Sequence, residues 1–101
     1  MNPPNQPICR YFSTYSGVRL PLKLSQPLEE HAIANRNTYF CGYFDQEGRI
    51  TGFQKMVYSE VELEHRYTYH PNGTLKQAEI IDTEQEVTLL NFDENGVGIQ
   101  G

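Results

Sequence analysis

The chain has 101 residues, of which 38% are hydrophobic. A chain of this length can form one small hydrophobic core but is too short for several domains. Its net charge is −5 at pH 7, and its eight lysines and arginines stand singly along the sequence. Nucleic acid and anionic membrane are therefore not expected partners, because binding to phosphates depends on clustered basic residues. We also expect no membrane span, since no apolar stretch approaches the roughly 20 residues that a span needs.

Residues 1–7 contain three of the six prolines and show no periodic pattern. We expect a flexible lead-in there, followed by a single antiparallel β domain over residues 8–101. The lead-in has neither the basic start nor the apolar core of a signal peptide. The sequence therefore predicts a cytoplasmic protein, in which Cys9 and Cys41 are reduced.

Residues 8–15 and 18–24 predict a first hairpin around a turn at Ser16-Gly17. In the second segment leucines alternate with polar residues and Pro21, which is the period-two pattern of a half-buried strand. Because proline cannot donate a hydrogen bond to a neighbouring strand, this strand should lie at a sheet edge or carry a bulge.

Residues 27–36 predict the only helix. Pro27 suits the first helical position, where a missing N–H has no cost, and Glu29 and Glu30 complement the positive end of the helix dipole. Leu28 and Ile33 belong to a narrow apolar stripe. A helix of about three turns is marginal alone, so we expect it to pack on the sheet.

Residues 38–92 predict a series of antiparallel strands, because the short turns between them cannot join parallel strands. Residues 45–48, 70–73 and 93–96 have turn composition, and each ends in glycine: Gly48, Gly73 and Gly96, with Gly17 in the first hairpin. Residues 82–85 form a further turn without glycine. After each of the first two turns apolar residues stand three positions apart, which predicts a β-bulge at the same place in both hairpins.

Residues 61–69 give the clearest strand. The apolar face carries Val61, Leu63, His65, Tyr67 and Tyr69, and the polar face carries Glu60, Glu62, Glu64 and Arg66. A sheet with one polar face needs a cover on the other. We therefore predict a mostly β (α+β) fold: a meandering antiparallel sheet of six to eight strands, curved or partly closed, with the short helix packed on it.

Two resemblances accompany these patterns. Residues 43–50 (YFDQEGRI) and 69–75 (YHPNGTL) resemble the antitoxin-component and Tyr/Asp-type β-hairpin repeats of bacterial proteins. Residues 11–17 (YFSTYSG), 20–24 (LPLKL), 35–40 (NRNTYF) and 61–67 (VELEHRY) together resemble a family of small bacterial proteins of unknown function. This second resemblance spans nearly the whole chain and implies a stand-alone bacterial cytoplasmic domain without a known activity.

The chemically active side chains form no catalytic or metal-binding pattern. His31, His65 and His70 fall on different elements or faces and lack cysteine or acidic partners at ligand spacing, so we expect no metal and no cofactor. The sequence also lacks a nucleophile elbow and a nucleotide-binding loop. Catalysis is therefore unsupported, and a hydrolase that uses His65 with a nearby glutamate or tyrosine ranks third among the hypotheses.

The leading hypothesis is a protein-interaction module that binds a protein partner or a second copy through a sheet face or edge. Tyrosine is favoured at interfaces, and an acidic row attracts a basic partner. The candidate binding residues are Tyr39, Tyr43, Tyr67, Tyr69, His65, Glu60, Glu62 and Glu64. The alternative hypothesis is a small-ligand carrier with a pocket between the curved sheet and the helix.

Overall fold

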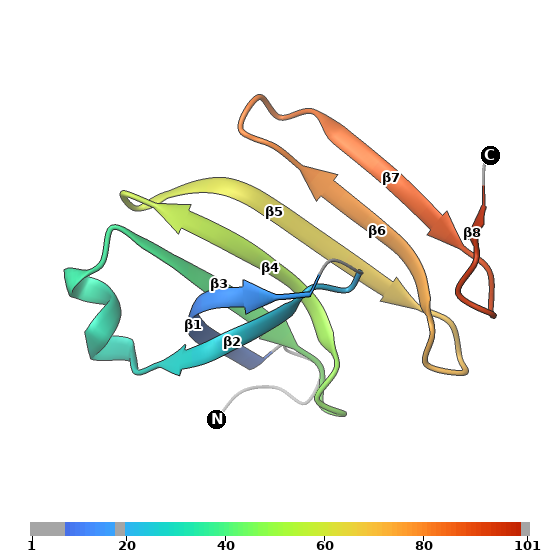
Figure 1. Ribbon diagram of the computed structural model, residues 1–101, viewed down its shortest axis with the longest axis horizontal. Coiled ribbons are helices and arrows are strands. Elements are labelled where there is room, and N and C mark those ends of the chain that lie inside the picture. Colours follow the sequence, from blue (N-terminus) through green and yellow to red (C-terminus); the bar gives the residue numbers. More distant parts are fainter. Residues whose placement is uncertain (1–7, 18–19, 100–101) are drawn as a thin grey trace.

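The computed structural model describes residues 8–17 and 20–99, which form one antiparallel sheet of eight strands (Figure 1). The strands are β1 (Ile8–Ser16), β2 (Lys23–Leu28), β3 (Thr38–Phe44), β4 (Ile50–Val57), β5 (Glu60–Tyr69), β6 (Leu75–Ile81), β7 (Val87–Phe92) and β8 (Gly98–Ile99). Their spatial order is β2-β1-β3-β4-β5-β6-β7-β8, so β2 and β8 are the two edges of an open sheet. The predicted mostly β meander is confirmed. The predicted lead-in over residues 1–7 lies outside the described residues.

Four strand connections share one turn geometry, and they begin at Asp45, His70, Asp82 and Asp93. In each turn the N–H of the first residue donates to the C=O of the fifth, and the N–H of the fourth residue donates to the C=O of the first. The fourth residue has a positive φ, and the four are Gly48, Gly73, Gln85 and Gly96. The predicted glycine turns are therefore confirmed, and Gln85 adopts the same conformation without being glycine.

Both predicted bulges are present and occupy equivalent positions. Gly52 pairs with Tyr43 and Ile50 pairs with Phe44, which leaves Thr51 as the extra residue of β4. In the next hairpin Gln77 pairs with Thr68 and Leu75 pairs with Tyr69, which leaves Lys76 as the extra residue of β6. These single insertions explain why apolar residues stand three apart on strands whose side chains otherwise alternate.

The hairpin of β1 and β2 covers the inner face of the sheet. β1 pairs with β3 only from Ile8 to Phe12, after which the hairpin crosses in front of β3 and β4 (Figure 1). The backbone N–H of Leu22 donates to the hydroxyl oxygen of Tyr67 at 3.2 Å, which ties the connection of the hairpin to β5. The buried core therefore joins residues of six strands: Phe12, Leu24, Phe40, Phe53, Tyr67, Leu75 and Ala78.

The helix differs from the prediction in its start, its type and its position. It is a 3-10 helix, η1 (Glu30–Asn35), with no buried residue, and it projects from the side of the sheet (Figure 1). Pro27 belongs to β2, where it lies opposite Phe12. Because β2 is an edge strand, the sheet tolerates the missing backbone N–H of Pro27. The prediction of a helix over 27–36 that covers the sheet is therefore wrong, and the cover is the β1–β2 hairpin.

The return strand of the first hairpin also begins later than predicted. It starts at Lys23 rather than at residue 18, so Pro21 lies in the connection between β1 and β2. Residues 18–19, where the predicted strand begins, are not among the described residues. The alternation of leucines at 20, 22 and 24 reflects packing against the core, to which Leu20 and Leu22 contribute from the connection and Leu24 from β2.

Candidate interaction surface

The predicted binding residues lie on opposite faces of the sheet and do not form one site. Cross-strand partners share a face, and the pairing of His65 with Phe53 and of Tyr67 with Ala78 places both on the inner, core-forming face. Tyr43 pairs with Gly52, and Gly52 with Arg66, on the outer face. The outer face therefore also carries Tyr39, Cys9, Cys41 and Glu64, whereas Tyr69 follows Tyr67 on the inner face.

The inner-face histidine is a structural group. His65 is buried and stacks on Phe53 with 4.4 Å between ring centroids, and its Nδ1 lies 2.8 Å from the hydroxyl of Tyr67. Burial lowers the pKa of His65, so the ring is neutral near pH 7. The Tyr67 oxygen also accepts the N–H of Leu22, so this phenol joins His65 to the connection between β1 and β2.

Tyr69 is likewise used inside the fold. Its hydroxyl donates to the backbone oxygen of Ile50 at 2.5 Å, and the guanidinium of Arg49 lies 5.1 Å from its ring centroid. Burial raises the pKa of Tyr69 to about 12, as it does for Tyr67. The inner-face members of the predicted binding set therefore hold the sheet and its cover together.

The outer face carries a continuous row of polar side chains across four strands. Tyr43 donates to Gln54 at 3.2 Å, and Gln54 donates to Glu64 at 3.5 Å. Arg66 then donates to Glu64 at 2.8 Å and to Glu79 at 3.2 Å. The side chains of this row are already hydrogen-bonded or ion-paired with one another in contact with solvent, and such exposed pairs contribute little free energy.

The predicted acidic row is also paired within the chain. Glu62 forms an ion pair of 3.1 Å with Lys55, and Glu64 forms one of 2.8 Å with Arg66. A β-bulge at the start of β5 reverses the side-chain register there, so exposed Glu60 lies on the inner face, opposite Val57, and Val61 lies on the outer face. The prediction that Glu60 shares a face with Glu64, and Val61 with His65, is therefore wrong. Two of the three glutamates thus have basic partners on the same sheet, and the three do not form one acidic face, which removes the main reason to expect a basic protein partner here.

The sheet beyond β5 is where apolar side chains remain uncovered. Val87 and Leu89 are 54% and 52% exposed on the outer face, where they pair with Ile81 and Glu79. Leu90 is 38% exposed on the inner face opposite buried Ala78. Apolar residues on both faces are typical of a strand that is covered on both sides. Here the β1–β2 hairpin does not reach β7, and the strand stands in a single layer (Figure 1).

The same strand presents an open backbone edge. Residues 91 and 92 pair with β8, which has only two residues. Residues 87–90 have no strand beside them on that side within the described chain. This surface, residues 87–90 with their side chains on both faces, is hereafter the β7 edge. The strand itself was predicted, but its exposure was not, because it depends on how far the N-terminal hairpin extends.

Two further observations concern metal ions and membranes. Residues 8–17 and 20–99 contain no cluster of three or more histidines, cysteines or acidic residues suited to a metal ion. None of the helical structure described is long and apolar enough to cross a membrane. Cys9 and Cys41 are free thiols on neighbouring strands.

A family model described as a family of unknown function, DUF6156, matches residues 4–101. This match agrees with the resemblance to a family of unknown function noted from the sequence. The resemblance to antitoxin-component and Tyr/Asp-type repeats stays a prediction. The comparisons with curated proteins and with solved structures give no match.

Proposed function

The chain belongs to DUF6156, a family of unknown function, and we propose that it is a protein-interaction module that adds an extended segment of a partner to the β7 edge. The observation that carries this proposal is the exposure of Val87, Leu89 and Leu90 on both faces of one strand. A strand laid beside β7 would cover part of all three side chains at once. Burying apolar surface contributes roughly 25 cal/mol per Å² to association.

The backbone of the β7 edge supports the same mode of binding. Unpaired N–H and C=O groups along a sheet edge are a template for another strand, and natural sheets usually protect them with lysine, proline or a bulge. Residues 87–90 (VTLL) contain none of these. An added strand would gain main-chain hydrogen bonds here and specificity from alternate side chains.

Charge selects the kind of partner. Acidic residues flank β7 at both ends: Asp82, Glu84 and Glu86 before it, and Asp93 and Glu94 after it. If two β7 strands paired antiparallel, the acidic turn of one copy would meet the acidic turn of the other, and like charges repel. The favoured partner is therefore a different chain, with alternating apolar residues and basic ends, and a homodimer is the less favoured form.

A bacterial cytoplasmic setting belongs to the same proposal. β1 and β3 bring Cys9 and Cys41 to the same face of the sheet, and both are free thiols. Cysteines that remain reduced on adjacent strands suit a reducing compartment.

The test uses a short synthetic peptide of alternating valine and threonine with lysine pairs at both ends. Titration into isotope-labelled protein, followed by two-dimensional NMR, should shift the amide signals of residues 87–90 in a saturable manner. A peptide of the same core with glutamate ends should bind at least tenfold more weakly, because its ends meet the acidic turns.

Variants locate the site. Leu89→Lys introduces a charge on the β7 edge and should weaken binding of the lysine-ended peptide about tenfold. Tyr58→Lys is the matched control, since Tyr58 is 73% exposed in the turn between β4 and β5, and its affinity should change less than twofold. Equal binding by both variants, or signal shifts confined to other strands, would refute the proposal. Concentration-dependent self-association without peptide would indicate a homodimer instead.

A further inference from the structure

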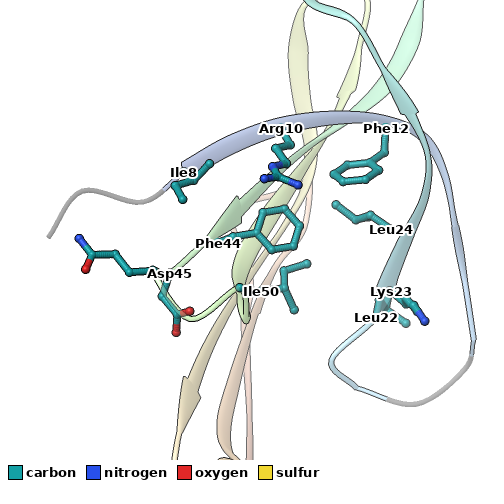
Figure 2. Close-up of a pocket in the computed structure, with 11 residues that line it drawn as sticks. Ile8, Arg10, Phe12, Leu22, Lys23, Leu24, Phe44, Asp45 and Ile50 are labelled. Carbon is teal, nitrogen blue, oxygen red and sulfur yellow. The ribbon is translucent and has the colours of Figure 1, made fainter. Parts of the chain in front are cut away.

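A pocket lies on a second surface, which is remote from β7 and independent of the proposed interaction. This pocket of about 480 Å³ lies between the β1–β2 hairpin and the β3–β4 turn (Figure 2). Its volume falls in the range of roughly 300–1,000 Å³ that holds small molecules. Residues of η1 do not line it, so it is not the pocket between sheet and helix that the sequence suggested. The hairpin that replaces the helix as the cover of the sheet forms one of its walls.

The walls of the pocket are apolar. Phe12, Leu24, Phe44, Ile50 and Ile8 contribute its hydrophobic side chains, and Figure 2 shows the Phe12 and Phe44 rings and Leu24 grouped around the hollow. Such walls bind the apolar body of a ligand and exclude water from it. Since a water molecule occupies about 30 Å³ in the liquid, the space suits a ligand on the order of ten to fifteen non-hydrogen atoms.

A glycine allows these side chains to converge. A Cβ atom on Gly42 would lie 2.5 Å from the Leu24 side chain, 3.0 Å from Phe44 and 3.3 Å from Phe12. All three neighbours line the pocket. The absence of a side chain at position 42 therefore lets them pack over the backbone of β3.

The polar groups of the pocket give it a positive character in an otherwise acidic protein. Arg10 and Lys23 both line it, and within the described residues neither forms an ion pair. Figure 2 shows Arg10 between Ile8 and Phe12, with its guanidinium directed toward the Phe44 ring. An unpaired guanidinium beside apolar walls is suited to a carboxylate or a similar anion.

The one acidic residue of the lining is already neutralised. Asp45 accepts from Nε of Arg49 at 3.0 Å and from the backbone N–H groups of Glu47 and Arg49, each at 2.9 Å. Its carboxylate points away from the apolar side chains (Figure 2). Asp45 therefore opposes an anion in the pocket only weakly, and the charges of Arg10 and Lys23 remain available.

We propose that this pocket binds a small amphipathic anion, with its apolar body between Phe12, Leu24 and Phe44 and its anionic group on Arg10. Lys23, at the rim on β2, adds attraction without fixing the ligand. The pocket, its apolar lining and the unpaired guanidinium of Arg10 support this site, which is independent of any binding at the β7 edge.

Octanoate is the probe, and octanol and octylammonium are its neutral and cationic matches. Two-dimensional NMR of the labelled protein should show octanoate shifting signals of Arg10, Gly42 and Phe44. Octanol should bind about fivefold more weakly, because it lacks the ion pair with Arg10, and octylammonium more weakly still. Equal affinity for the three compounds, or shifts located on β7, would overturn the proposal, since either result describes an unselective apolar surface.

Arg10→Gln should weaken octanoate binding about fivefold and leave octanol binding unchanged, because only the charge is removed. Lys76→Gln is the matched control: Lys76 is exposed on β6, away from the pocket lining, and octanoate affinity should stay within twofold. A loss of octanoate and octanol binding together in Arg10→Gln would refute the role of its charge. If Arg10→Gln does not fold, the comparison of the three compounds on the unaltered protein still decides the matter.

Discussion

His65 and Tyr67, two residues apart on β5, are joined by a hydrogen bond of 2.8 Å between Nδ1 and the phenol. Both rings lie on the buried face, and Leu22 of the covering hairpin donates to the same phenol oxygen. The pair therefore links the sheet to its cover. Each member has a pKa displaced by burial, downward for His65 and upward for Tyr67, in the sense that keeps it uncharged.

Acidification should destabilise the protein through His65. Its folded pKa is lower than the ordinary value of 6.5, so the unfolded chain binds more protons as the pH falls below 6.5. The free energy of unfolding should be constant above that value and fall below it. Urea unfolding on either side of pH 6.5 measures the effect. His31→Gln, at an exposed position of η1, should retain the same dependence, whereas a flat profile in the unaltered protein would contradict the burial of His65.

Alkali should destabilise the protein through Tyr67 and Tyr69. The pKa of each is raised to about 12 from the ordinary value of 10, so stability is full below pH 10 and is lost as the pH rises toward 12. Tyrosinate absorbance should show these two phenols ionising together with unfolding. Tyr58→Phe serves as the control because Tyr58 is exposed, and it should leave the late phase intact. Ionisation of every tyrosine before unfolding would disprove the prediction.

Gln85→Gly should stabilise the protein by about 0.5–1 kcal/mol. Gln85 has φ of 66° at the turn position that glycine fills in the three equivalent turns. Relief of the left-handed conformation outweighs the greater freedom that glycine gains in the unfolded chain. The mirror experiment is Gly48→Ala, which should cost about 1 kcal/mol at φ of 85°. Thermal and urea unfolding measure both variants. The prediction requires that the free energy of unfolding rises in Gln85→Gly and falls in Gly48→Ala.

Gly52→Ala should cost about 2 kcal/mol or more. A Cβ atom at this position would lie 2.5 Å from the backbone oxygen of His65, so the neighbouring strand would have to move. Gly98→Ala on β8 is the matched control, because an added Cβ there meets no atom within 4 Å. Its unfolding free energy should change by less than about 0.5 kcal/mol. Equal effects of the two substitutions would show that β4 and β5 are not so closely packed.

The sequence predicted those features of the fold that depend on local chemistry. Alternation over residues 61–69 assigned the correct face to His65 and Tyr67, and the three-residue spacing of Leu75 and Ala78 identified a bulge. The prediction of the helix over residues 27–36 was wrong because the sequence signals for its start also suit an edge strand. Pro27 suits the start of a helix and equally an edge strand, and pairing with β1 favoured the strand.

The candidate surfaces were harder to predict because they depend on long-range packing. The predicted tyrosine set depends on residue type alone, and the sheet divides Tyr39 and Tyr43 from Tyr67 and Tyr69. Arg10 is one of eight single basic residues in the sequence, and it lines a pocket only because the β1–β2 hairpin folds over the β3–β4 turn. A strand over residues 86–92 was predicted, but the exposure of the β7 edge depends on how far the covering hairpin extends.

The covering hairpin also divides the molecule into regions of unequal local stability. Under it, the amide of Phe53 belongs to a residue only 1% exposed and should exchange with solvent only when the whole protein unfolds. Beyond it, β7 and β8 are held by one neighbour each along most of their length and should open far more often. A partner bound at β7 would therefore order a strand that otherwise opens locally. The free-energy cost of that ordering would reduce the affinity of the partner.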